Sequence, residues 1–489
     1  MIKNQSGGVS MKVLFVSSEA HPFIETGDLA DVAYALPKAL RKLGIDARVI
    51  IPKYSGIPSS FKDCMETIDR FTVPVGWRNQ YCGLQYLTYD DIPYYFVDNE
   101  DYFKRASIYD CYDDGERFSY FSRSILESIK YMGDFIPDII HCNDWHCGIV
   151  PALLKEHYSY EERYSKIKTL FTIHNLKYQG LFPKEILGDF LNLDETYFKE
   201  DALKFYDSIS FMKGGIIFSD AVTTVSNAYS QEIQTPSYGE GLCGLLSSKA
   251  EKLYGILNGI DYELYNPKVD KKIFYEYDQN NIKQKVENKL KFQEELSFTV
   301  NKDIPMIGIV TKLVKQKGLD LIIDKLEELL SLDAQIVLIG NGDEYYEDIF
   351  KFFESRYPSR ISTTIIFDEK QAQLIYAASD MFLMPSLFEP SGIEQLIALK
   401  YGSIPIIRET GGLKDASIFY SKYTGNGNGF SFTNYSSDEL LDAVNRALDL
   451  YKDKESWNKL VRNAMLSNYS WEKSAKNYTN LYNEMIKHV

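Results

Sequence analysis

The sequence predicts an α/β protein with two doubly wound domains, each built on a parallel sheet. Short, β-branched apolar runs alternate with longer helical patterns along all 489 residues. The strand runs are continuously apolar, as in sheets that helices cover on both faces. A fresh strand–helix series begins near residue 306, and the chain is long enough for two or three domains with their own cores.

The first series runs from the start of the chain to about residue 226, and each apolar run in it is followed by a polar or helical stretch. The expected strands are Lys12–Ser17, Ala47–Ile51, Pro93–Val97, Asp138–Cys142, Lys168–Ile173 and Ala221–Ser226. The expected helices are residues 28–43, 116–132, 145–157 and 203–218. Residues 1–10 are mostly polar and lack the apolar core of a signal peptide.

The second series has the same character. Its expected strands are Met306–Val310, Gln335–Gly340, Thr363–Phe367, Met381–Pro385 and Ile404–Ile407. Its expected helices are residues 318–331, 371–378, 392–401 and 437–450. The polar stretch 266–303 predicts a surface helix and connection, and the amphipathic pattern at 470–487 predicts a helix that returns to the first domain.

These two series place the domains at residues 11–252 and 253–469, with a final segment at 470–489. Doubly wound sheets bind ligands at the carboxyl ends of their strands. We therefore expect the binding residues in the loops that follow the strands, opening into a crevice between the domains.

Composition narrows the class of partner. A hydrophobic content of 45% and a charged content of 25% are typical of a soluble globular protein. The net charge of −15 argues against nucleic acid or an anionic membrane and fits a neutral polymer with a small anionic donor. No apolar run reaches the roughly 18 residues of a membrane span. The six cysteines form no CxxC pair, so we expect reduced thiols and a cytoplasmic protein.

The segment from Phe388 to Gly392 is the most informative one. It follows a buried strand pattern, carries one carboxylate at Glu389, and opens a helix at Ser391 and Gly392. A helix N-terminus can hold a diphosphate, and an adjacent carboxylate can meet a sugar hydroxyl or a developing positive charge. The segment therefore suggests sugar transfer from a nucleotide, against the alternative of an ordinary strand-to-helix turn.

Two other strand ends in the second half have phosphate-binding character. Lys312, Lys315 and Lys317 fall within six residues after the strand at 306–310, and could neutralise a diphosphate leaving group. Thr410, Gly411 and Gly412 form a glycine-rich helix entry suited to phosphate or ribose. A solvated basic loop and a simple helix cap are the alternatives.

The loop at 22–32 joins the first strand to the first helix. Thr26 is a candidate N-cap, and Gly27 permits close backbone approach. Because Glu25 and Asp28 would repel a phosphate, we favour a capped helix whose first turn carries Asp28 and Asp31 to complement the dipole.

Histidines mark two further strand ends. His141, Asp144 and His146 are of types that ligate zinc, but on a strand-to-helix turn they need not converge. We favour a histidine that donates to a sugar hydroxyl over a metal site. His174 and Asn175 end another strand, with a structural histidine as the alternative.

Together these segments resemble the bacterial glycogen synthases and plant starch synthases that use ADP-glucose. The resemblance runs from about Lys12 to the C-terminus. Its motifs are Glu25–Val32, Asp144-Trp145-His146, His174-Asn175, Ser210–Gly215, Thr223–Ser226, Tyr238–Leu242, Leu257–Asp261, Lys312–Gly318, Pro385–Gly392, Tyr401-Gly402 and Thr410–Leu413. So many motifs in order along the whole chain argue against a chance resemblance.

The resemblance implies a GT-B fold, in which two Rossmann-like domains face each other across a cleft and the last helix returns to the first domain. It implies glucose transfer from ADP-glucose to the non-reducing end of an α-1,4-glucan, with retention of configuration and no metal or other cofactor. The first domain would serve the glucan acceptor and the second the ADP-glucose.

Site residues follow by position from the same resemblance. The implied catalytic residues are Glu389, Lys317, Lys312 and His146. The implied substrate-binding residues are Glu25, Gly27, Asp31, Asp144, His174, Asn175, Asn258, Ser391, Gly392, Thr410, Gly411 and Gly412. Nucleic acid and membrane are not expected as partners.

The first loop departs from the family pattern Lys-Thr-Gly-Gly-Leu-Ala-Asp-Val, because Glu25 and Asp28 replace the Lys and the second Gly. Lys312 also replaces an Arg, which keeps the charge and loses the bidentate fork. Three explanations of the acidic loop stay open: a different loop pose, a compensating cation, or a weak enzyme. Alternatives to an active enzyme are a silent glucan-binding paralogue, or a transferase that uses UDP-glucose.

Overall fold

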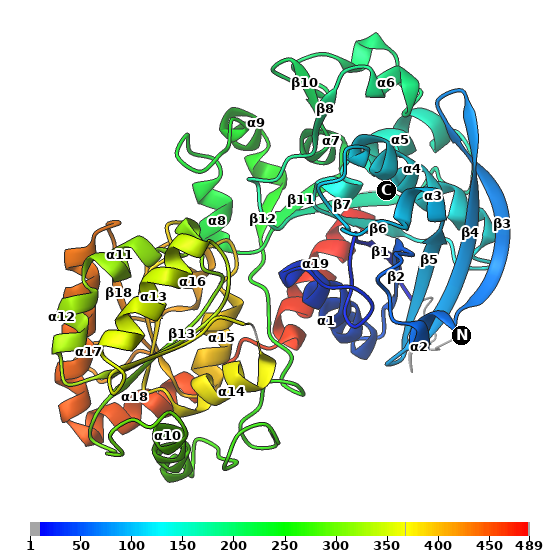
Figure 1. The fold of residues 1–489 in the computed structure, drawn as a ribbon. Helices are drawn as coiled ribbons and strands as arrows, with labels where there is room; N and C mark the ends of the chain where they lie inside the picture. Colours follow the sequence, from blue (N-terminus) through cyan, green and yellow to red (C-terminus); the bar gives the residue numbers. More distant parts are fainter. Residues whose placement is uncertain (1–9, 367, 488–489) are drawn as a thin grey trace. The chain divides into compact units, whose positions relative to one another are not determined.

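The computed structural model describes residues 10–366 and 368–487, and the chain forms two compact units (Figure 1). One unit contains the chain up to Val225, Ser230–Ile256 and the segment from Trp471 onward. The other contains Ser226–Tyr229 and Leu257–Ser470. Among the described residues, no helix is both long enough and apolar enough to cross a membrane.

The first unit is built on a nine-stranded sheet. In sequence order its strands are β1 (Lys12–Val16), β2 (Asp46–Pro52), β3 (Glu66–Val75), β4 (Arg78–Tyr89), β5 (Ile92–Asp98), β6 (Ile139–Asn143), β7 (Lys168–Ile173), β11 (Ala221–Thr224) and β12 (Leu253–Gly255). Their spatial order is β12-β11-β7-β6-β1-β2-β5-β4-β3. The pairs from β12 to β5 are parallel, whereas β4 and β3 pair antiparallel at one edge.

Helices and short helical turns connect these strands. They are α1 (Asp28–Lys42), α2 (Ser59–Lys62), α3 (Glu100–Phe103), α4 (Asp114–Ser128), η1 (Ile129–Tyr131), η2 (Trp145–Cys147), α5 (Val150–Leu153), η3 (Leu154–Tyr158), α6 (Ile186–Asp189), η4 (Glu195–Tyr197), α7 (Phe211–Phe218), α9 (Cys243–Ser248), η5 (Ala250–Lys252) and α19 (Trp471–Lys487). Helix α8 (Asn227–Glu232) has residues in both units. A small antiparallel sheet has the order β8 (Leu181–Pro183), β10 (Ser208–Ser210), β9 (Lys204–Phe205).

Two expected helices of this unit were wrong in extent. The helix expected at 203–218 begins only at Phe211, because the preceding residues form β9 and β10 and Ser210 caps the helix by accepting a hydrogen bond from the Lys213 N–H. The helix expected at 145–157 is broken into η2, α5 and η3, with Pro151 at the start of α5, where a missing N–H is tolerated.

The second unit contains a fully parallel sheet, as the sequence predicts, but the sheet has six strands, because residues 430–432 form a strand that the sequence did not predict. Its strands are β13 (Met306–Val310), β14 (Gln335–Ile339), β15 (Ile361–Thr364), β16 (Met381–Met384), β17 (Ile404–Arg408) and β18 (Phe430–Phe432), in the order β15-β14-β13-β16-β17-β18. Its helices are α10 (Lys283–Glu295), η6 (Lys315–Lys317), α11 (Leu319–Asp324), α12 (Leu326–Ser331), α13 (Glu344–Arg356), α14 (Glu369–Ala378), α15 (Ile393–Lys400), α16 (Gly411–Ala416), α17 (Ser437–Lys452) and α18 (Lys454–Leu466).

Three details differ from expectation. Helix α10 lies within the expected surface stretch 266–303, but its Lys289 is buried, donating to Asp380 at 2.8 Å and to the Tyr451 hydroxyl at 2.7 Å. The helix expected at 318–331 is interrupted at Lys325. Of the strand expected at 363–367, the structure forms β15 up to Thr364, and Phe367 lies outside the described residues.

The last helix returns to the first unit, as expected. Helix α19 packs along α1, which Figure 1 shows as the red and dark blue helices. Its Tyr482 hydroxyl lies 2.8 Å from His141 Nδ1 in β6, and the other ring nitrogen of His141 lies 2.6 Å from Thr172 Oγ1 in β7. Burial holds the pKa of His141 well below its usual range, so the ring is neutral and uses one nitrogen as donor and the other as acceptor.

We predict that Tyr482→Phe lowers the free energy of unfolding by about 1–3 kcal/mol, because it leaves a buried ring nitrogen of His141 without a partner. Urea unfolding followed by circular dichroism measures the change. Tyr160→Phe, at a 78% exposed tyrosine of the same unit, is the control and should unfold like the unchanged protein. Equal effects of the two substitutions would contradict this role for the Tyr482 hydroxyl.

Candidate active site

Three neighbouring strands of the second unit end in the loops that carry its predicted site residues. Strands β13, β16 and β17 are adjacent and parallel, so their carboxyl ends meet at one edge of the sheet. The loop after β13 contains Lys312 and Lys317, the loop after β16 contains Glu389, and the turn after β17 contains Gly411 and Gly412. The topology therefore gathers residues that are far apart in the sequence.

Glu389 is a buried carboxylate at this edge. Its side chain is 5% exposed, and Oε2 accepts from Lys317 Nζ at 2.6 Å and from Ser386 Oγ at 3.1 Å. Burial raises the pKa of Glu389, while the Lys317 ammonium acts in the opposite direction. The structure thus pairs one buried carboxylate with one lysine whose side chain keeps 14% exposure.

Close backbone contacts fix the loop around Glu389. The Gly412 N–H donates to the Glu389 carbonyl at 3.0 Å. A Cβ atom at Gly412 would lie 1.8 Å from the Ser391 carbonyl oxygen, and one at Gly411 would lie 2.0 Å from that of Glu389. Gly318 has a φ of +72° and meets the Pro385 carbonyl in the same way, at 2.1 Å. Only glycine fits at these three points.

An arginine supports the same loop from β17. Arg408 Nη1 donates to the carbonyl oxygens of Ser386 and Leu387, at 3.2 and 2.6 Å. The Leu387 N–H in turn donates to the Gln316 carbonyl at 2.8 Å, which ties the Glu389 loop to the lysine loop. Arg408 was not predicted as a site residue, although its charge, directly after the apolar run 404–407, could have indicated a role at this strand end.

The other predicted site residues of the second unit differ in burial and in their hydrogen bonds. Asn258 Nδ2 donates to Ser391 Oγ at 3.3 Å, and its buried Oδ1 has no hydrogen-bond partner among the described residues. Gly392, with φ +73°, is the N-cap of α15, and the buried Thr410 is the N-cap of α16. Lys312 is exposed, in contrast to Lys317, which is the lysine that the structure pairs with Glu389.

The first unit repeats this arrangement with β1, β6 and β7, which are adjacent and parallel. The loop after β1 contains Glu25 and Gly27, and Asp31 follows in the first turn of α1; all three residues are exposed. Gly27, not the expected Thr26, is the N-cap of α1. The Thr26 N–H and hydroxyl instead donate to Glu19 Oε2, at 2.6 and 2.9 Å.

Asp144 follows β6 and His174 follows β7, and a hydrogen bond between them links the two strand ends. The His174 N–H donates to Asp144 Oδ1 at 2.8 Å, and His174 Nε2 lies 2.9 Å from Asn143 Oδ1. Burial raises the pKa of Asp144 to about 7 against the opposing hydrogen bonds from the backbone N–H groups of His174 and Asn175. Burial lowers the pKa of His174 to about 3, so its imidazole is neutral.

His146 is held by aromatic rings rather than by ion pairs. It stacks on Tyr109 with 4.5 Å between ring centroids and meets Phe118 edge-on at 4.9 Å. Burial, and secondly the Arg117 charge, keep the pKa of His146 well below its usual range. Its buried Nδ1 has no hydrogen-bond partner within the described part of the chain. A neutral ring nitrogen without a partner among these residues is chemically suited to a hydrogen bond with a hydroxyl group.

The metal alternative considered for His141, Asp144 and His146 finds no geometric support. His141 is hydrogen-bonded to Tyr482 and Thr172, and Asp144 to the His174 backbone. Among the described residues, the groups whose ligand atoms converge lie elsewhere, at His21, Glu25 and Asp31 and at Cys111, Asp113 and Asp114. All six cysteines are free thiols.

Two doubly wound units, each with its predicted site residues at the carboxyl ends of parallel strands, have the architecture of the GT-B class of glycosyltransferases. Residues 12–248 match the family model of the starch synthase catalytic domain, and residues 292–464 match that of the glycosyl transferases group 1. The chain belongs to the family of glycogen synthases and starch synthases, which are hexosyltransferases.

Several relatives match nearly the whole chain. The glycogen synthase of Clostridium acetobutylicum is 57% identical over 477 residues, which cover 97% of this chain and 100% of that protein. The glycogen synthase of Caldicellulosiruptor saccharolyticus is 55% identical, with 98% and 100% covered. The catalytic domain of starch synthase IV from Arabidopsis thaliana, solved with ADP and acarbose, superposes with a TM-score of 0.90 at 34% identity, with 98% of this chain and 100% of that one covered.

A more distant structure shares the fold alone. The sucrose-phosphate synthase of Thermosynechococcus elongatus superposes with a TM-score of 0.61 at 16% identity, and the match covers 98% of this chain and 100% of that one. The expected α/β fold of the GT-B type is thereby confirmed.

We predict that Asp144→Asn flattens the pH dependence of stability. The native carboxyl holds its proton up to about pH 7, whereas the unfolded one loses it near its ordinary value of 3.8. The native state therefore binds more protons between these values, and Asp144 costs stability as pH rises, by up to roughly 4 kcal/mol. Urea unfolding should show that the free energy of unfolding of the variant, relative to that of the unchanged protein, is higher at pH 8 than at pH 4.5. A constant difference would contradict the raised pKa.

We predict that Gly412→Ala destabilises the second unit by about 1–3 kcal/mol, because its Cβ meets the Ser391 carbonyl and the backbone has to shift. Urea unfolding measures the loss. Gly244→Ala, in α9, is the matched control, since a Cβ there meets nothing within 4 Å. It should leave stability unchanged or slightly higher. An unchanged free energy of unfolding in Gly412→Ala would contradict this prediction, because it would show that the loop backbone shifts without cost.

Proposed function

We propose that this protein transfers glucose from ADP-glucose to the non-reducing end of an α-1,4-glucan, with retention of configuration. The observation that carries the proposal is the buried Glu389–Lys317 pair, 2.6 Å apart, at the strand ends of the second unit. Support comes from relatives at 55–57% identity that are glycogen synthases, and from a 34% identical starch synthase bound to ADP and acarbose.

The second unit would bind the donor. Lys312 and Lys317 would neutralise the diphosphate, whose negative charge grows as the glycosidic bond breaks. Cations that are fixed before the reaction stabilise that charge most in the transition state, which is where they accelerate the reaction. Glu389 would contact the glucosyl group and stabilise the positive character that develops there. Asn258, Gly411 and Gly412 would complete the donor site.

The first unit would serve the sugar and the acceptor. Nδ1 of the neutral His146 would hydrogen-bond a glucose hydroxyl, and Asp144, His174 and Asn175 shape the strand ends beside it. The departing phosphate itself can take the proton of the attacking hydroxyl. The lysines supply the positive charge in this mechanism, so glucosyl transfer needs no metal.

One observation favours a second candidate function. Glu25, Asp28 and Asp31 place three carboxylates in and just after the first loop, and these disfavour an anionic donor. A glucan-binding protein without turnover is consistent with that loop. Incubating the pure protein with ADP-glucose or UDP-glucose and glycogen separates these candidates. Release of ADP supports the proposal. Release of UDP alone would identify UDP-glucose as the donor. If neither nucleotide is released, the glucan-binding protein without turnover is the better interpretation.

We predict that Glu389→Gln and Lys317→Met each lower kcat for ADP release by about 10²–10³-fold, because each removes one electrostatic contribution to the transition state. Initial rates at saturating ADP-glucose measure the loss. Lys315→Met is the matched control, since it removes the same charge from an exposed position of the same loop. Full activity in Glu389→Gln, with the control also active, would remove Glu389 from the mechanism.

A further inference from the structure

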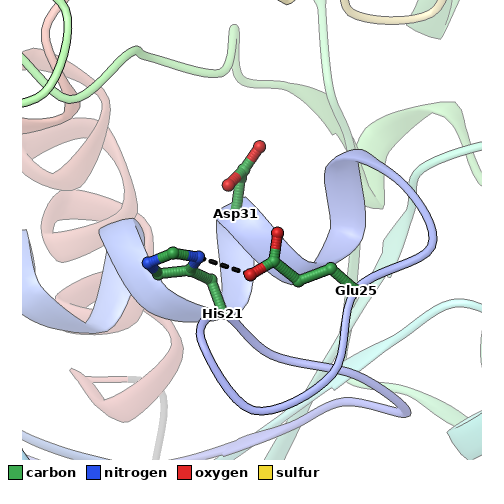
Figure 2. A group of neighbouring side chains, drawn as sticks. All are labelled: His21, Glu25 and Asp31. Carbon is green, nitrogen blue, oxygen red and sulfur yellow. Dashed lines mark hydrogen bonds and ion pairs between the residues drawn. The ribbon is translucent and has the colours of Figure 1, made fainter. Parts of the chain in front are cut away.

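Three side chains of metal-ligating type converge in the first loop. His21 Nδ1 lies 2.5 Å from Glu25 Oε1, and Asp31 comes from the first turn of α1 beside them (Figure 2). One ligand atom from each of His21, Glu25 and Asp31 lies within 4.8 Å of the other two. Glu25 and Asp31 are exposed and His21 is half-buried, so an ion could reach all three from solvent.

The backbone holds these residues in place without an ion. The Phe23 and Ile24 N–H groups both donate to the Ala20 carbonyl, at 2.9 and 3.1 Å, so the chain turns tightly between His21 and Glu25. The His21 N–H donates to the Ala30 carbonyl at 3.1 Å, which fixes the turn to the start of α1, next to Asp31.

Side chains fix both ends of the same loop. Glu25 is followed by Thr26, whose N–H and hydroxyl both donate to the buried Glu19. The His21 ring meets the Tyr34 ring edge-on, with 5.1 Å between centroids, and Tyr34 in turn donates to Asp90 at 2.6 Å. The ligand set is therefore preorganised, which lowers the conformational cost of binding an ion.

The carboxylates of the second converging group are already held in ion pairs with arginines. Asp113 of that group pairs with Arg105 at 2.8 Å, and Asp114 pairs with the buried Arg117. Those carboxylates already have fixed cations, which compete with a metal ion. At the first loop, the partner that the structure gives to Glu25 is a histidine, which is itself a metal ligand once neutral.

We propose that His21, Glu25 and Asp31 bind a divalent first-row transition-metal cation. One imidazole nitrogen and two carboxylate oxygens are a ligand set suited to Mn²⁺, Co²⁺ or Zn²⁺, with water in the remaining positions. Binding replaces the His21–Glu25 hydrogen bond by two metal bonds. The ion would also offset two of the three negative charges of Glu25, Asp28 and Asp31.

This last consequence rests on the proposed function. If the protein binds ADP-glucose, an ion at the first loop reduces the repulsion of its diphosphate and lowers KM. The ion would then tune donor affinity, while Lys312 and Lys317 still neutralise the leaving group. Chelation should raise KM and leave kcat largely unchanged.

The test begins with ion binding, which needs no donor. The full chain is freed of metal with a chelator and titrated with Co²⁺ by calorimetry and visible absorption, and with Mn²⁺ by electron paramagnetic resonance. We expect one site, weakened at least tenfold in His21→Ala and in Glu25→Gln. Cys111→Ser is the matched control in the other converging group and should bind as the unchanged protein does.

Three results would overturn the site: no binding at millimolar metal, unchanged binding in His21→Ala and Glu25→Gln, or binding lost in Cys111→Ser. Thermal unfolding without metal checks that each variant is folded. Because Glu25 is exposed and His21 is half-buried, we expect His21→Ala and Glu25→Gln to stay folded. Cys111→Ser exchanges two side chains of similar size and should also stay folded.

Donor kinetics then separate the ion's role from the proposed function. In the unchanged protein the metal should lower KM for ADP-glucose severalfold. The double substitution Glu25→Lys with Asp28→Gly supplies a fixed charge, so its KM should be low and insensitive to metal. Ion binding without a change in KM overturns the charge role. Absence of ADP release under all conditions refutes the proposed function, and the ion titration alone then decides whether the metal site exists.

Discussion

The position of Glu389 depends on backbone contacts that are closer than a Cβ atom permits. Gly318, Gly411 and Gly412 touch the carbonyl oxygens of Pro385, Glu389 and Ser391. These contacts join the ends of β13, β16 and β17 into one layer, with Arg408 donating to two further carbonyls. A buried carboxylate is costly unless its partners are fixed, and this layer fixes both Lys317 and Ser386 against it.

The predicted site residues of the two units are held by different means. The second unit buries a carboxylate against an ammonium, so its charge is balanced within a low-dielectric site. The first unit buries neutral imidazoles: His146 lies among aromatic rings, and burial brings the pKa of His174 to about 3. The predicted site residues Glu25 and Asp31, in the loop after β1 and the first turn of α1, are exposed. A neutral polar site suits sugar hydroxyls, and a charged one suits phosphate.

The acidic first loop has a definite structure. Of the three explanations that the sequence left open, the His21–Glu25 contact and the neighbouring Asp31 give geometric support to a compensating cation. The loop also differs locally from expectation, since Thr26 binds Glu19 and leaves Gly27 as the N-cap of α1. Thr26 is of a residue type that often caps helices, but here its side chain holds the loop and does not cap α1.

Most of the parallel strands, the loops at their ends and Glu389 within those loops could be predicted from the sequence, because a continuous apolar run followed by a glycine-rich turn has few other solutions. The short parallel edge strands β12 and β18 were not predicted. The antiparallel β3 and β4, the burial of Lys289 and the part played by Arg408 could not be predicted. Those features depend on partners far away in the chain, such as Asp380 for Lys289 and the Ser386 carbonyl for Arg408. Local pattern specifies which element a segment forms, whereas long-range packing selects the atoms that lie within hydrogen-bonding distance of it.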